Sequence, residues 1–161
     1  TLDRSSAASD VYKRQEVMLA ATDLLAETKV APELSNEAHY YRAKAYLDAG
    51  KVEGAMDDLK ILAKDTRNIY GAEAKYKVAQ IYFDAGQTEQ AEKEVLDYIE
   101  VSTPHTYWLA RSFVLLSDVY MKLGRNLDAK QYLLSLKQNY QADDDIAGMI
   151  ESRLNKLNAE N

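Results

Sequence analysis

Few residues in this chain could carry out chemistry. Its 161 residues include no cysteine and two histidines, His39 and His105. Thiol nucleophiles, disulfides and thiolate zinc sites are therefore excluded, and neither histidine has a Cys, Asp or Glu at HExxH-like spacing. The sequence contains no glycine-rich phosphate loop, nucleophile elbow or recognisable catalytic carboxylate pair. These observations predict a protein that is not an enzyme and that binds no metal and no cofactor.

Two acidic runs, Asp57-Asp58 and Asp143-Asp144-Asp145, could suggest cation binding. Neither run has the alternating oxygen ligands and central glycine of a calcium loop. A solvated helix face explains the first run. A helix start explains the second, because carboxylates there face the positive end of the helix dipole. We expect neither run to hold an ion.

Composition predicts a folded, all-helical chain. Hydrophobic residues make up 47% and charged residues 29%, and only two prolines and six glycines interrupt helix-forming stretches. The 26 acidic and 20 basic residues give a formal charge of −6, which disfavours nucleic acid as a partner. No run of 18 apolar residues exists, so we expect no membrane-spanning segment.

Residues 1–15 have no apolar period and differ from the sequence that follows. Residues 5–15 resemble the translation of a transposase-type sequencing adapter. The resemblance implies that 1–15 is a non-native segment fused to a truncated gene, so the missing signal peptide or lipid-anchor motif says nothing about the intact protein. Without its two acidic and three basic residues, the remainder has 24 acidic and 17 basic residues, a formal charge of −7. The acidic balance is therefore unchanged.

One pattern of small residue, Tyr, Gly and Ala recurs at offsets 0, 3, 7 and 12. Its second copy lies 36 residues after the first, and its third lies 38 residues further on. A small residue lets two helices approach, Tyr fills the gap one turn later, and Gly can end the first helix in a left-handed conformation. The pattern predicts three helical hairpins. Its copies are Ala43, Tyr46, Gly50 and Ala55; Ala79, Tyr82, Gly86 and Ala91; and Ser117, Tyr120, Gly124 and Ala129.

This spacing resembles the tetratricopeptide repeat (TPR), a 34-residue helix-turn-helix. The resemblance implies a bacterial TPR protein with an all-α, right-handed α-α superhelix of three and a half repeats. In the first repeat His39 and Arg42 stand where the family prefers Trp and Leu, so we expect His39 to be a partly buried replacement for the aromatic residue, and His105 to lie on the surface. The implied segments are 16–35, the second helix of a truncated repeat; 36–71, 72–109 and 110–142, three repeats; and 143–161, a capping helix and tail.

The helical periodicity and the start signals predict eight helices. Thr103-Pro104 reads as a helix start, because Thr can cap and Pro is tolerated in the first turn. Apolar residues of the last helix should cover the repeat before it: Ile146, Met149, Ile150, Leu154 and Leu157. The predicted helices span 16–29, 36–49, 52–66, 71–85, 88–101, 105–123, 126–141 and 144–158.

In the TPR family the first helices line a concave groove, and the resemblance implies five groove residues in each repeat. Aromatic and methionine side chains at such positions are typical of interaction surfaces, although contacts with the next helix would also explain them. Chaperone-binding members use Lys and Asn at two of these positions to hold a C-terminal carboxylate. Here Tyr40, Lys44, Tyr76 and Gln80 occupy them, so that activity is not implied. The predicted groove residues are Glu37, Tyr40, Lys44, Leu47, Asp48, Glu73, Tyr76, Gln80, Phe83, Asp84, Arg111, Val114, Asp118, Met121 and Lys122.

The resemblance implies a non-catalytic protein-protein interaction module that binds a peptide or protein segment in this groove. Two alternatives stay open: an assembly module of a bacterial cell-envelope complex that uses its convex face or ends, and an accessory domain of a larger enzyme. The Tyr-rich, Ala-rich and acidic composition is similar to that of envelope TPR proteins, which favours the periplasm over the cytoplasm. An uncovered strip around Val17 and Leu24 also predicts either an artificial helix over 5–15 packed on it or self-association.

Overall fold

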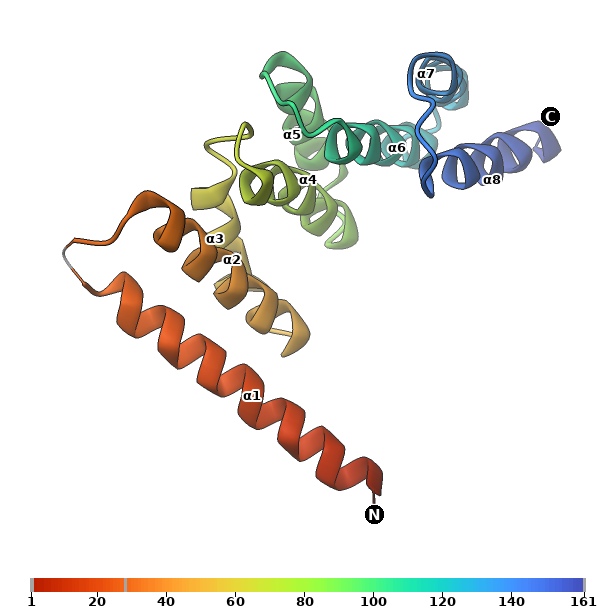
Figure 1. Cartoon of the computed structure of the whole chain (residues 1–161). Coiled ribbons are helices and arrows are strands. Elements are labelled where there is room, and N and C mark those ends of the chain that lie inside the picture. Colours follow the sequence, from red (N-terminus) through yellow and green to blue (C-terminus); the bar gives the residue numbers. More distant parts are fainter. Residues whose placement is uncertain (1, 28, 161) are drawn as a thin grey trace. The chain divides into compact units, whose positions relative to one another are not determined.

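The protein is all-helical, which confirms the predicted all-α class (Figure 1). The computed structural model describes residues 2–27 and 29–160, with side chains from residue 6 onward, and no strand occurs among them. The helices are α1 (Leu2–Leu25), α2 (Pro32–Asp48), α3 (Val52–Leu62), α4 (Ile69–Asp84), α5 (Thr88–Glu100), α6 (Thr106–Lys122), α7 (Asn126–Asn139) and α8 (Ile146–Ala159). They form two compact units, Thr1–Asp65 and Thr66–Asn161, and each is described by itself.

Seven of the predicted helices begin and end within four residues of α2 to α8. The first differs, because α1 begins at Leu2 and not near Glu16. Residues 2–15 contain no Pro or Gly that would stop a helix, so the helical conformation continues through them.

The turns after α2, α4 and α6 share one hydrogen-bonded geometry. Gly50, Gly86 and Gly124 have φ between +75° and +78°, which confirms the predicted left-handed conformation. In the second turn the Gly86 N–H donates to the Phe83 carbonyl at 3.0 Å, and the Gln87 N–H donates to the Tyr82 carbonyl at 2.9 Å. This pair of bonds is a Schellman motif. The repeated Tyr-to-Gly spacing therefore encodes the end of each first helix.

Gly86→Ala should lower the free energy of unfolding by about 1–2 kcal/mol, because a Cβ disfavours the left-handed conformation. No atom lies within 4 Å of the added Cβ, so backbone strain alone causes the loss. Gly148 is the matched control. It lies inside α8, its Cβ would also meet nothing, and Gly148→Ala should raise stability by about 0.5–1 kcal/mol. Urea unfolding of both variants tests the prediction, and a stabilised Gly86→Ala variant would contradict it.

In the Thr1–Asp65 unit, α2 packs against both α1 and α3. The Arg14 guanidinium donates to the Asp48 carbonyl at 2.7 Å, and Arg42 donates to the Thr22 hydroxyl at 3.2 Å. Helix α1 therefore runs antiparallel to α2, and its residues before Arg14 extend past the end of α2 (Figure 1). Residues 5–15 are helical, which agrees with one of the two expected outcomes, but they continue α1 and so do not fold back on the strip around Val17 and Leu24. Val17 on this helix is 38% exposed.

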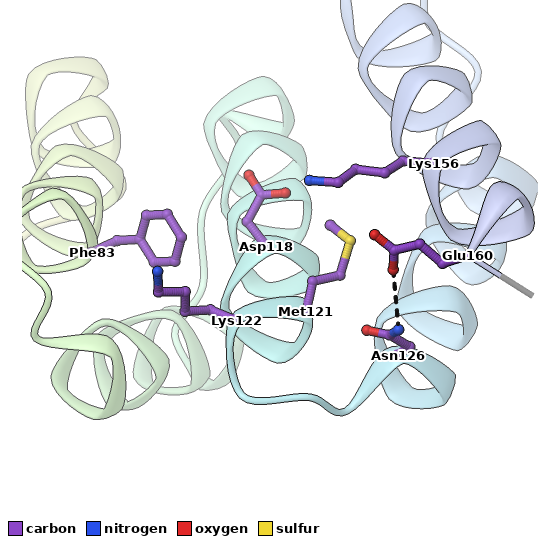
Figure 2. A pocket seen from close by; sticks show the side chains of 7 residues that line it. All are labelled: Phe83, Asp118, Met121, Lys122, Asn126, Lys156 and Glu160. Carbon is purple, nitrogen blue, oxygen red and sulfur yellow. Dashed lines mark hydrogen bonds between the residues drawn. The ribbon is translucent and has the colours of Figure 1, made fainter.

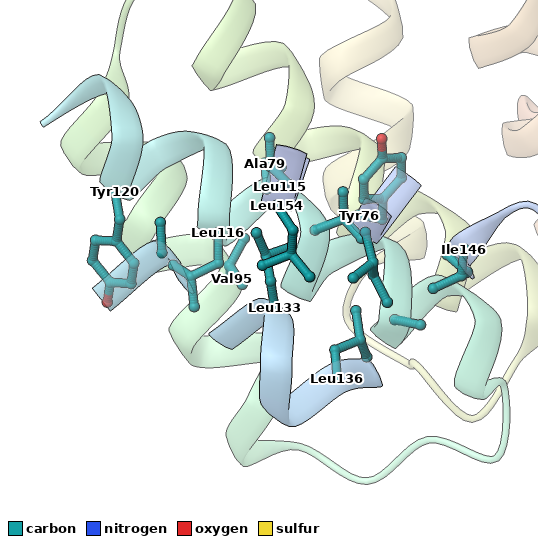
Figure 3. Packing of buried hydrophobic residues seen from close by; sticks show 14 of the residues in the cluster. Tyr76, Ala79, Val95, Leu115, Leu116, Tyr120, Leu133, Leu136, Ile146 and Leu154 are labelled. Carbon is teal, nitrogen blue, oxygen red and sulfur yellow. The ribbon is translucent and has the colours of Figure 1, made fainter. Parts of the chain in front are cut away.

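The Thr66–Asn161 unit contains two hairpins, α4 with α5 and α6 with α7, followed by α8. Helix α6 packs against both α4 and α5, and α8 packs against both α6 and α7. Side chains from all five helices form one hydrophobic core (Figure 3). The predicted apolar face of α8 contributes to it, with Ile146, Ile150, Leu154 and Leu157 buried and Met149 partly buried.

The start of α6 differs from the prediction at Thr103-Pro104. Helix α6 begins at Thr106, and the Thr103 hydroxyl is used elsewhere. It donates to the Thr66 carbonyl at 2.7 Å and accepts from the His105 N–H at 3.1 Å. Thr103 therefore ties two loops together and does not cap the helix.

Each hairpin has one matched pair of side chains at an equivalent place, with the two partners 19 residues apart. The first pair is hydrogen-bonded at 2.7 Å, the second is an ion pair at 3.2 Å, and the third is a ring contact with centroids 6.2 Å apart. His39 on the first hairpin therefore has a side-chain partner on the opposite helix, as do the equivalent residues Lys75 and Phe113. The pairs are His39–Asp58, Lys75–Glu94 and Phe113–Tyr132.

Candidate functional site

The acidic pair Asp57-Asp58 is divided between solvent and core. Asp57 is exposed, as expected, but Asp58 is only 1% exposed, so a solvated face is the wrong explanation for it. Its carboxylate accepts from Arg42 Nη2 at 2.6 Å, from Arg42 Nε at 2.8 Å, and is bonded to His39 Nδ1 at 2.7 Å. The hydrogen bond to Asp58 raises the pKa of Arg42, against the opposing effect of burial. This cluster holds α2 and α3 together.

Tyr76 is buried at 6% exposure, so it does not offer the exposed groove surface expected of it. Its ring stacks on Trp108 with centroids 5.6 Å apart, and the Arg111 guanidinium lies 4.9 Å from its centroid. Arg111 donates to the Tyr76 hydroxyl at 2.9 Å and to the Tyr107 hydroxyl at 3.0 Å. Burial raises the pKa of Tyr76, and Arg111 opposes that change. Tyr76 and Arg111 therefore join α4 to α6, the helix contact that the sequence left open as an alternative.

The remaining predicted groove residues fall into groups by helix. On α2, Glu37, Lys44 and Asp48 are exposed, while Tyr40 and Leu47 are half-buried. These five residues belong to the Thr1–Asp65 unit.

On α4 and α6, side-chain contacts account for some predicted positions. Glu73 pairs with Lys77 at 2.8 Å, and Asp84 accepts from the Gln80 amide at 2.8 Å. Val114 is 3% exposed and belongs to the core. Glu73, Asp84 and Val114 therefore have structural contacts of their own.

Two pockets in the Thr66–Asn161 unit bring predicted groove residues together. The smaller, of about 90 Å³, is lined by Tyr76, Gln80, Arg111, Val114 and Asp118 together with three further residues. The larger, of about 420 Å³, shares Asp118 with it, and we call it the Phe83–Met121 pocket (Figure 2). Its lining residues are Phe83, Asp118, Met121, Lys122, Asn126, Lys156 and Glu160.

The Phe83–Met121 pocket combines partly buried apolar side chains with charged ones. Asp118 accepts from Arg153 Nε at 2.7 Å and from Arg153 Nη2 at 2.9 Å. Glu160 accepts from the Asn126 amide at 3.4 Å. Both carboxylates of the pocket therefore have hydrogen-bond partners within the unit.

The residues that α8 adds to these pockets are absent from the predicted groove. The repeat spacing of the sequence indicates three of these residues. Repeating the 38-residue displacement once more takes Arg111, Asp118 and Lys122 to Met149, Lys156 and Glu160, and each of these lines one of the two pockets. Helix α8 packs on α6 and α7 as α6 packs on α4 and α5, in addition to covering the core.

Among the described residues, no group of three or more His, Cys, Asp or Glu side chains is placed to hold a metal ion. Asp144 accepts from the Ile146 N–H at 2.9 Å, so the second acidic run serves the start of α8. None of the described helices combines the length and the apolar character that crossing a bilayer requires. Comparisons of the chain with protein-family models, with curated proteins and with solved structures gave no match.

Proposed function

We propose that the chain is a non-catalytic protein-binding module of the TPR type, which holds a segment of a partner protein in the Phe83–Met121 pocket. The observation that carries the proposal is the convergence of four predicted groove residues on one pocket: Phe83, Asp118, Met121 and Lys122. Apolar side chains flanked by polar groups are typical of binding sites for protein segments.

Two features of the fold support the TPR-like part of the proposal. The left-handed glycines end the first helices at the repeat positions. In the Thr66–Asn161 unit, α6 packs on both helices of the hairpin before it, and α8 does the same with α6 and α7. This is the stacking by which solenoid repeats bury a continuous core.

A selection from a displayed library of 12-residue peptides tests the proposal. We expect the full chain to enrich a peptide family, and Phe83→Ala/Met121→Ala to weaken binding of a selected peptide by at least about tenfold, or 1.4 kcal/mol, because anchors in pockets dominate binding energy. Leu127→Ala/Leu134→Ala is the matched control on α7, where the two leucines are 72% and 46% exposed. Circular dichroism checks that both variants keep their helices.

The same leucines support the second candidate function, an assembly module that uses its convex face. Leu127 and Leu134 lie seven residues apart, so they share one face of α7. Loss of binding in the leucine variant with full binding in the Phe83/Met121 variant would favour this candidate and contradict the pocket.

A further inference from the structure

We infer that the segment bound in the Phe83–Met121 pocket carries side-chain carboxylates on both sides of an apolar residue. This inference rests on the proposed function and adds the chemistry of the partner. The ammonium groups of Lys122 and Lys156 line the pocket, and neither forms an ion pair with any residue that the structure describes. The charges left unmatched in the pocket are therefore positive.

The formal charges around the pocket favour an acidic ligand. Asp118, Glu160, Lys122 and Lys156 cancel formally, and Arg153, which holds Asp118 through two hydrogen bonds, adds one positive charge. The lining itself is thus formally neutral, and the site becomes positive by one charge when Arg153, which lies outside the lining, is included, on a chain whose total is −6. A complementary ligand for this pocket is anionic. Opposite charges speed the association of ligand and protein and fix the position in which the ligand binds.

The helix dipole explains why Lys122 and Lys156 lie at the ends of their helices. It does not explain why both side chains line the pocket. Both lie in the last turn of a helix, where a cation offsets the negative end of the dipole. The attraction between a cation and the helix dipole acts in the last turn whichever way the lysine side chain points. Here the two side chains come from different helices, α6 and α8, and line the same pocket.

The arrangement of the two ammonium groups indicates two separate carboxylates. Figure 2 shows the Lys122 side chain extending toward Phe83 and the Lys156 side chain extending toward Asp118, with Met121 between the two lysines. Because the two ammonium groups lie apart, a segment whose apolar residue contacts Phe83 and Met121 needs one carboxylate for each lysine, and these carboxylates belong to different residues of the segment. We therefore assign the ligand as an internal acidic-apolar-acidic segment of a protein.

The test uses peptides with acetylated N-termini and amidated C-termini, so that only side chains carry charge. From the selected peptide family we compare an acidic peptide with its Asp→Asn, Glu→Gln counterpart, by fluorescence polarisation at low salt. We expect the wild-type chain to bind the acidic peptide at least tenfold more tightly, and added salt to reduce the difference.

Charge reversal supplies the matched variants. Lys122→Glu/Lys156→Glu should reverse the preference and select peptides with Lys or Arg beside the apolar residue. Lys64→Glu/Lys93→Glu makes the same change in net charge at exposed sites outside the pocket, and should keep the acidic preference.

The outcomes separate the inference from the proposed function. Selected peptides without acidic bias, whose binding still needs Phe83 and Met121, would overturn the inference and leave the proposed function intact. Peptides that bind equally to the charge-reversed and control variants would also overturn the inference. A wild-type chain that enriches no peptide, or whose binding ignores Phe83 and Met121, would overturn the proposed function itself.

Discussion

Replacing Asp58 with asparagine is expected to lower the free energy of unfolding of the Thr1–Asp65 unit by about 3 kcal/mol. Removing one partner of a buried ion pair typically costs about 3–5 kcal/mol, because the other charge stays buried without compensation. Here the side chains of Arg42 and His39 are 19% and 13% exposed, so the lower end of that range applies. The asparagine keeps the shape of Asp58 but not its charge.

Native-state hydrogen exchange of the buried amides of α2 and α3 measures this loss within its own unit. Asp57→Asn is the control, because Asp57 is the exposed neighbour on the same helix, and it should change stability by less than about 0.5 kcal/mol. Equal small effects of the two substitutions would show that the Asp58 cluster does not hold α2 and α3 together.

Replacing Tyr76 with alanine should lower the free energy of unfolding of the Thr66–Asn161 unit by about 3–5 kcal/mol, the usual cost of removing a buried aromatic side chain. Its ring stacks on Trp108, and its hydroxyl accepts from Arg111, so both contacts are lost. Tyr76→Phe keeps the stack and removes only the hydrogen bonds, which should cost about 1 kcal/mol.

Trp108 is the single tryptophan of the chain and lies against Tyr76, so its fluorescence during urea unfolding reports on this unit. Leu127→Ala on α7 is the control for truncating an exposed apolar residue, and should change stability by less than about 0.5 kcal/mol. A Tyr76→Ala variant as stable as this control would contradict the buried, structural role of Tyr76 and favour the predicted role on the groove surface.

The hairpins could be predicted from sequence because their ends are encoded locally. A left-handed residue after a helix favours glycine strongly, and Gly50, Gly86 and Gly124 mark three such places. The apolar period of α8 was equally readable, since one face of a helix follows a fixed spacing. The lack of an apolar period in residues 1–15 did not predict that α1 begins at Leu2, because a helix can continue through residues that contain no Pro or Gly even without an apolar face.

Pairings between helices could not be predicted in the same way. The spacing placed Tyr76 correctly on one face of its helix, but the neighbour that covers that face, α6 with Trp108 and Arg111, depends on tertiary packing. The usual exposure of carboxylates predicts a solvated Asp58, and its burial depends on its partners on α2. The informative signal was on the opposite helix, where His39 and Arg42 supply the hydrogen-bond partners of the buried carboxylate.

Backbone amide chemical-shift mapping of the full chain with a capped acidic-apolar-acidic peptide tests most directly whether the Phe83–Met121 pocket is the binding site. We expect saturable shift changes concentrated at Phe83, Met121, Lys122, Asn126 and Lys156, with the amides of α5 unaffected. Shift changes concentrated on the exposed face of α7 around Leu127 and Leu134, or on α1 to α3, would contradict it.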